Sequence, residues 1–198
     1  MKARSELLPE AMAAREDYWI LYLARIHGGK GQDHALKLWN SLSADTRHKC
    51  RLIFVGPATD THEAERIGGL ISKSMDPEHI CMAGPSLKPH DWLRCADLYL
   101  SCSEFEGMPL SPVEAIGSGI PSVLSDIPGH DFLKSYAETY SLSDPNAGAL
   151  HLEKIVALMV ENDSKLRESA WISSQGLRDA FTLKSMSTRY EKLYEANA

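Results

Sequence analysis

Two glutamates, Glu106 and Glu114, stand eight residues apart in the stretch 101–130, SCSEFEGMPLSPVEAIGSGIPSVLSDIPGH. Glu106 lies in a polar loop after the apolar run 97–101, and Glu114 lies in the predicted first turn of the next helix. A ligand lying across that turn could contact both carboxylates, which are good acceptors for sugar hydroxyls. In open α/β sheets, anionic ligands bind where a helix begins after a buried strand, because free N–H groups and the helix dipole converge there. The spacing therefore predicts a ligand site at this loop.

The same pattern allows a structural interpretation of Glu114. Ser111, Pro112 and Glu114 fit the N-cap, N1 and N3 positions of a capping box. Glu106 fits no such pattern, although an isolated loop glutamate is most often simply solvated. Cap and ligand group both remain open for Glu114 on these local grounds.

Two cations follow the first strand-like run, YWILYLA at 18–24, whose continuous apolar character is typical of a strand buried on both faces. Arg25 comes directly after this run, and Lys30 precedes a predicted helix over 32–42. The stretch Gly28-Gly-Lys-Gly31 lacks the first glycine and the Ser/Thr of a Walker A motif, so we reject a P-loop. Two cations at the carboxyl end of a strand suit a diphosphate, and the alternative is a solvated loop.

The stretch EGMPLSPVEA at 106–115, followed by GIPSV at 119–123, resembles the signature of the retaining GT-B glycosyltransferases, also called glycosyl transferases group 1. This family includes glycogen and sucrose synthases and many lipopolysaccharide, capsule and lipid-linked sugar transferases. The resemblance extends from about residue 19 to residue 194. It implies that Glu106 contacts the donor sugar and is catalytic, as electrostatic stabiliser or as nucleophile, and that Glu114 binds the ribose. It also implies backbone contacts to the donor sugar and phosphates from Gly107, Met108 and Leu110, whereas Pro109 has no N–H to donate.

The resemblance assigns further residues to the donor. Arg25 and Lys30 match the pair that clamps its diphosphate, with Ala24 in place of the customary glycine. Gly56 and Gly84 follow the second and third predicted strands, where the family's loops approach the donor and its base. The family needs no metal, and the sequence has no DxD motif. We therefore expect no metal and no cofactor, and a nucleoside-diphosphate sugar, UDP- or GDP-linked, as substrate.

The predicted elements alternate between strands and helices. Strands are expected at 18–24, 51–55, 79–83, 97–101, 121–124 and 139–142, and helices at 32–42, 61–75, 88–95, from 111, at 147–161 and twice within 164–196. Such alternation predicts an α/β fold, a Rossmann-like doubly wound parallel sheet of about six strands in the order 3-2-1-4-5-6, with helices on both faces. This is one half of a GT-B fold. Residues 1–17 are expected to be a linker or leading helix, and residues 18–198 the nucleotide-sugar-binding domain with its C-terminal helices.

Composition limits what else the chain can be. With 198 residues, 43% apolar and 24% charged, it suffices for one globular domain, so the N-terminal acceptor domain of a GT-B enzyme is expected in a further part of the same chain or in a separate chain. The net charge of −6 argues against a nucleic-acid partner. The sequence shows neither a membrane-spanning run nor a signal peptide, which favours a cytoplasmic protein. Peripheral membrane association through the missing half stays open.

The four cysteines lack CxxC spacing and are expected to be reduced and buried.

The expected function is that of a donor-binding domain, which carries a sugar from a nucleoside-diphosphate sugar to an acceptor in polysaccharide, lipopolysaccharide or glycolipid synthesis. The isolated domain is expected to be inactive. The alternative is a non-catalytic nucleotide-sugar sensor or scaffold on the same fold, since fold alone does not determine function. Together, Arg25, Lys30, Glu106 and Glu114 favour the enzyme.

Overall fold

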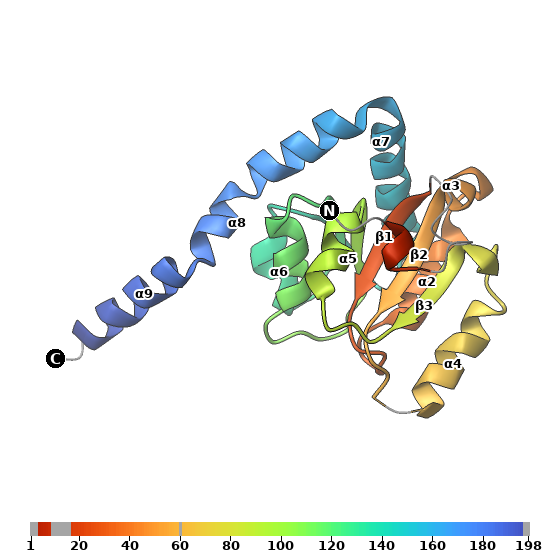
Figure 1. Cartoon of the computed structure of the whole chain (residues 1–198), viewed down its shortest axis with the longest axis horizontal. Coiled ribbons are helices and arrows are strands. Elements are labelled where there is room, and N and C mark those ends of the chain that lie inside the picture. Colours follow the sequence, from red (N-terminus) through yellow and green to blue (C-terminus); the bar gives the residue numbers. More distant parts are fainter. Residues whose placement is uncertain (1–3, 9–16, 60, 196–198) are drawn as a thin grey trace.

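The protein is built around one parallel sheet of six strands in the order β3-β2-β1-β4-β5-β6, as Figure 1 shows in part. The computed structural model describes residues 4–8, 17–59 and 61–195. The strands are β1 (Tyr18–Leu23), β2 (Cys50–Val55), β3 (Ile80–Gly84), β4 (Leu98–Ser101), β5 (Ser122–Ser125) and β6 (Glu138–Tyr140). All neighbouring strands pair in parallel, so the predicted fold class and strand order are confirmed.

Helices cover both faces of this sheet. The α-helices are α2 (Gln32–Ser41), α3 (Ala44–Lys49), α4 (Thr61–Ile71), α5 (Pro89–Cys95), α6 (Leu110–Gly117), α7 (Pro145–Ser173), α8 (Gln175–Ala180) and α9 (Leu183–Glu195), with 3-10 turns η1 (Arg4–Glu6), η2 (Pro77–His79) and η3 (Pro128–Leu133). Alternate side chains of β1 enter two separate cores. Ile20 and Tyr22 pack on the side of α2, α4 and α7, whereas Trp19 and Leu21 pack on the side of α5, α6 and α8.

The strand order reverses at β1. This strand pairs with β2 on one side and with β4 on the other, with Ile20 opposite Leu98 and Leu21 opposite Tyr99. The chain after β1 and the chain after β4 therefore leave the same edge of the sheet next to each other. In open α/β sheets, the crevice at such a reversal is where ligands bind.

Several predicted boundaries differ from the structure. The helix α4 ends at Ile71, and α7 continues to Ser173 across a kink at Asn162, where φ is −163° and ψ is 83°. The helix α3 was not predicted; it is short and polar, and its N-cap Ser43 accepts a hydrogen bond from the Thr46 N–H. The sixth strand begins one residue earlier and ends two earlier than predicted.

The predicted capping box at the start of α6 is wrong. The first helical residue is Leu110, the N-cap position is occupied by Pro109, and no side chain caps it. Ser111 is instead the second residue of α6. Glu114 consequently lies in the second turn of α6, and the capping interpretation of this residue fails.

The C-terminal helix α9 forms an arm that extends away from the sheet (Figure 1). A short helix, α8, fills the predicted break near residues 176–181, and none of the residues of α9 is buried. The linker or leading helix predicted over residues 1–17 falls mostly outside the described residues, and so does the end of the last predicted helix. Among the described helices, none has both the length and the apolar composition that crossing a membrane requires.

The cysteines are all free thiols, as predicted. Cys50 and Cys102 are buried, and burial raises the pKa of each thiol to about 12. Cys81 and Cys95 are only half-buried, so for these two the prediction of burial is wrong.

Candidate functional site

Glu106 and Lys30 meet at the carboxyl edge of the sheet. Glu106 Oε1 accepts hydrogen bonds from Lys30 Nζ and from Ser103 Oγ, each at 2.7 Å. The side chains of Lys30 and Glu106 are 23% and 13% exposed, so the ion pair is half withdrawn from water. The structure thus joins two of the predicted site residues and adds Ser103, which sequence analysis did not predict.

The loop that carries Lys30 and the loop that carries Glu106 are connected by hydrogen bonds. The Tyr22 hydroxyl donates a hydrogen bond to the carbonyl of Lys30 and accepts one from the Cys102 N–H at 2.9 Å. Gly31 has a φ of +73°, and a Cβ at this position would lie 1.8 Å from the carbonyl oxygen of Cys102. Because only glycine allows this approach, Gly31 sets the separation between the Lys30 loop and the Glu106 loop.

A cavity of about 230 Å³ opens between the two loops. Its lining includes the predicted residues Arg25, Lys30, Glu106, Met108 and Leu110, together with Leu23, Ala24, Tyr99, Ser101, Ser103, Pro109, Ser111 and Pro112. Arg25 is exposed, and its carbonyl accepts a hydrogen bond from the buried Gln32 amide at 2.7 Å. No carboxylate of the described residues pairs with the Arg25 guanidinium. The cavity therefore has one unpaired cation and one cation held by Glu106.

Glu114 does not line this cavity. It is exposed and borders a neighbouring hollow with His90, Gly117 and Arg178. Tyr99 connects the two places, because its pKa is raised first by burial and then by the negative charges of Glu106 and Glu114. The charges of both glutamates thus raise the pKa of one buried hydroxyl.

The backbone amides predicted to contact the donor differ in availability. The Leu110 N–H already donates to the carbonyl of Met108 at 3.0 Å. Within the part of the chain that the structure describes, the N–H groups of Gly107 and Met108 make no hydrogen bond to protein. These two amides are therefore the better candidates for ligand contacts.

The two loop glycines lie outside the 230 Å³ cavity. At Gly56, with a φ of +150°, a Cβ would lie 2.0 Å from the Ala24 carbonyl oxygen, so this glycine lets the ends of β1 and β2 approach closely. Its N–H also donates to the carbonyl of Gly84 at 2.9 Å. Gly84 has a φ of +76° and open space around the Cβ position. The backbone conformation explains why glycine occupies both positions, and contact of either glycine with a donor stays a prediction.

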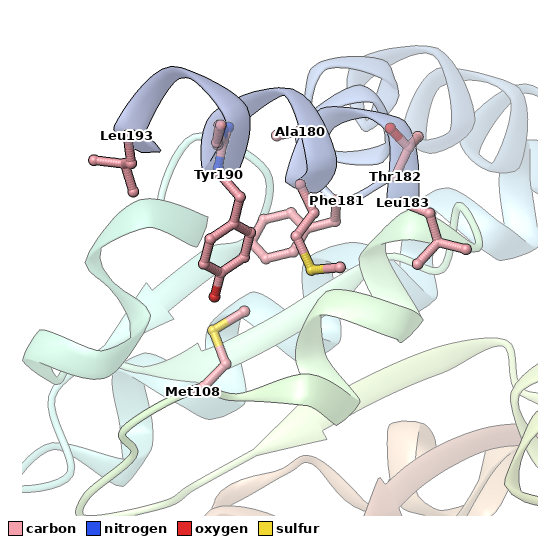
Figure 2. A pocket seen from close by; sticks show the side chains of 9 residues that line it. Met108, Ala180, Phe181, Thr182, Leu183, Tyr190 and Leu193 are labelled. Atoms are coloured by element: carbon pink, nitrogen blue, oxygen red, sulfur yellow. The ribbon is translucent and has the colours of Figure 1, made fainter. Parts of the chain in front are cut away.

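A second, apolar groove of about 450 Å³ lies between the Glu106 loop and the C-terminal arm. Figure 2 shows Tyr190 of α9 pointing toward Met108, with Phe181 beside it. Leu183, Met186 and Leu193 of the same helix continue the groove and are more than half exposed. The arm thus presents apolar side chains next to the site without burying them.

An open parallel sheet with a polar cavity at its reversal of strand order belongs to the class of Rossmann-like ligand-binding domains. Residues 5–172 match the model of the family described as glycosyl transferases group 1. The chain belongs to this family, whose members transfer sugars. Over 77 residues it is 31% identical to the lipopolysaccharide core biosynthesis mannosyltransferase LpsB of Rhizobium meliloti (strain 1021), a match that covers 38% of this chain and 22% of LpsB.

Solved structures show the same fold. Anabaena Alr3699/HepE, solved with UDP and glucose, superposes with a TM-score of 0.78 at 15% identity over 94% of this chain and 50% of HepE. A UDP-forming α,α-trehalose-phosphate synthase of Burkholderia xenovorans gives a TM-score of 0.76 at 14% identity over 96% of this chain and 46% of that protein. The fold is thus that of one half of a GT-B glycosyltransferase, and the chain spans about half the length of these structural relatives.

Proposed function

We propose that this chain is the donor-binding domain of a retaining glycosyltransferase, which moves a sugar from a nucleoside-diphosphate sugar to an acceptor. The observation that carries the proposal is the convergence of Arg25, Lys30 and Glu106 on one cavity at the reversal of strand order. Membership of the sugar-transferring family supports it. Polysaccharide, lipopolysaccharide or glycolipid synthesis in the cytoplasm is the proposed setting, and the likeness to a lipopolysaccharide core mannosyltransferase is in line with this.

The proposed mechanism follows from where charge develops. When the bond between the sugar and the phosphate breaks, negative charge grows on the leaving diphosphate. Arg25 and Lys30 stabilise that charge more in the transition state than in the ground state, which lowers the barrier. The proposed mechanism uses neither a metal ion nor a cofactor.

Glu106 acts at the other end of the breaking bond, where the sugar becomes electron-poor. A carboxylate held by two hydrogen bonds at 2.7 Å keeps its place while the charge develops, which is what electrostatic stabilisation requires. Stabiliser and nucleophile are the two roles that we propose to separate by experiment. The Gly107 and Met108 amides bind the donor's sugar and phosphates, and Glu114 binds the ribose.

We further propose that an acceptor domain, in the same chain or a separate one, covers the apolar groove of Figure 2. The groove includes Met108, which also lines the donor cavity, so a domain bound in the groove would cover the neighbouring donor cavity. Tyr190 and Leu193 are 56% and 59% exposed, so a partner can bury a large apolar area at this place. A closed site excludes water and holds the acceptor, and for this reason the chain alone should transfer sugar slowly or not at all.

Calorimetry with UDP, GDP and ADP tests the proposal. We expect one of the three to bind at submillimolar concentration, and the matching nucleoside to bind more weakly because it lacks the diphosphate. If none binds at millimolar concentration to protein shown to be folded, the donor-domain proposal is wrong. If a nucleotide sugar binds but no transfer follows when the acceptor domain is supplied, the sensor becomes the better proposal.

A further inference from the structure

His130 is a fully buried histidine that the proposed mechanism does not use. It lies in η3, directly after β5, with no exposed surface. Its Nδ1 is 2.8 Å from the carbonyl oxygen of Ser125, and because a carbonyl only accepts, Nδ1 carries the proton. Burial lowers the pKa of His130, so the ring is neutral near pH 7. Within the described residues, Nε2 has no hydrogen-bond partner. Among the described residues, the polar contacts that orient the ring are therefore those of Nδ1 with Ser125.

A line of hydrogen bonds leads from this histidine to Glu106. Ser125 accepts from His130 through its carbonyl, and its hydroxyl donates to the carbonyl of Ser103 at 2.6 Å. The Ser103 hydroxyl donates to Glu106 Oε1 at 2.7 Å. Ser125 and Ser103 are buried, so water competes little with the two bonds of Ser125. The carboxylate is thereby connected to β5 and to the loop that follows it.

The backbone of the same loop supports Glu106 from a second side. A Cβ added at Gly129 would lie 2.3 Å from the carbonyl oxygen of Glu106 and 2.8 Å from its Cβ. The peptide of Gly129 therefore packs directly against Glu106. The loop turns there because the His130 N–H donates to the carbonyl of Ile127 at 2.9 Å, while its ring is bonded to Ser125.

We infer that His130 is a positioning residue for Glu106. Its ring closes the loop 125–130, so that Gly129 supports the Glu106 backbone and the two serines hold the Glu106 carboxylate. The inference rests on the proposed function, in which Glu106 contacts the donor sugar. It therefore concerns the sugar end of the donor, whereas the diphosphate end is held from the other loop by Arg25 and Lys30.

Calorimetry on the full chain measures the affinity for UDP-glucose and for UDP, and likewise for GDP-mannose and for GDP. The ratio of the two affinities in each pair is the preference for the nucleotide sugar. His130→Leu keeps much of the ring's volume and removes the N–H, whereas His130→Asn places an amide N–H where Nδ1 was. We expect the leucine variant to lose about tenfold in preference for the nucleotide sugar, the usual worth of a misplaced hydrogen bond to a charged group. Affinity for the nucleoside diphosphate should change by less than about twofold, and asparagine should restore most of the preference.

Gly129→Ala gives an independent test, should the leucine variant fail to fold. Its methyl group must displace Glu106, so we expect the same loss of sugar preference although His130 is intact. The inference is overturned if Gly129→Ala keeps the parent ratio, if a folded His130→Leu keeps it, or if asparagine behaves like leucine. It is also overturned if sugar and diphosphate affinities fall together, as a general loss of structure would cause. A parent that binds neither nucleoside diphosphate instead contradicts the proposed function itself, and a parent without sugar preference contradicts the Glu106 contact.

Discussion

Replacing Lys30 and Arg25 by methionine should separate the two cations of the cavity, because among the described residues Lys30 takes part in an ion pair and Arg25 does not. Its ammonium group lies 2.7 Å from Glu106 Oε1, and the two side chains are 23% and 13% exposed. Arg25 is exposed and forms no ion pair with any described residue. Lys30→Met should therefore affect stability and ligand binding, whereas Arg25→Met should affect ligand binding alone.

The expected loss of stability follows from the burial of the pair. Breaking a fully buried ion pair costs about 3–5 kcal/mol, and an exposed pair contributes about 0–1 kcal/mol. Lys30 and Glu106 lie between these limits, and Ser103 still donates to the carboxylate after the change. We expect Lys30→Met to lower the free energy of unfolding by about 1–2 kcal/mol, which lowers the melting temperature of a domain of this size by roughly 2–8 °C. For Arg25→Met the change should stay within about 0.5 kcal/mol.

Binding of the nucleoside diphosphate should weaken in both variants by about 1.5–3 kcal/mol, or roughly 10- to 150-fold, while the nucleoside is bound as before. Lys30 should lie at the lower end of this range, because a diphosphate competes with Glu106 for its ammonium group. Melting followed by circular dichroism and calorimetry with UDP, GDP and ADP measure the two effects. Glu106→Gln is the matched control, since it weakens the pair and leaves both cations in place. The clamp is refuted if both methionine variants bind the diphosphate like the parent, and the ion pair matters little if Lys30→Met melts like Arg25→Met.

Three further changes test other parts of the site. Glu114→Gln should weaken nucleotide binding by about 1–2 kcal/mol without lowering the melting temperature, and full affinity would remove the ribose role. Gly31→Ala should cost several kcal/mol or prevent folding, since its Cβ would meet the Cys102 carbonyl at 1.8 Å, whereas Gly28→Ala, with open space around its Cβ, is the neutral control. Burial lowers the pKa of His130 below 6.5, so the unfolded state binds more protons just below that pH and stability falls as the pH falls. His130→Asn should reduce this fall between pH 7 and pH 5, and an unchanged pH profile would contradict it.

The sheet could be predicted from the sequence because its strands are buried on both faces. The runs that form β1 and β2 are continuously apolar apart from Arg51, and their helical connections leave few arrangements for a parallel sheet. Element ends were less predictable. Asn162 bends α7 without ending it, and the polar sequence of α3 carries little hydrophobic pattern. In both cases tertiary packing decides what the local sequence leaves open.

The charged residues that line the cavity could be predicted from the sequence, but the residues that hold them in place could not. Arg25, Lys30 and Glu106 follow strands that the strand order places side by side, so their meeting follows from topology. Ser103 carries no such signal, because a serine after a strand is common in loops. Its bond to Glu106 depends on the geometry of a loop held by Gly129, a contact between residues distant in sequence. The capping box failed for a related reason, since α6 begins at Leu110, one residue before Ser111, although the local sequence favours a cap at Ser111.

The two glutamates that the sequence presents as a pair occupy different environments, and the difference agrees with the proposed roles. Ser103 donates a hydrogen bond to Glu106 Oε1 at 2.7 Å and Gly129 packs against the Glu106 backbone, so the carboxylate stays restrained when a diphosphate takes up the Lys30 ammonium group. A carboxylate that is fixed in advance stabilises a transition state without the cost of reorganisation. Glu114 is exposed on the second turn of α6. An exposed side chain can adjust to ribose hydroxyls, and binding the ribose in the ground state does not require a side chain that is fixed in advance. Catalysis should therefore depend on the surroundings of Glu106, and nucleotide affinity on Glu114 itself.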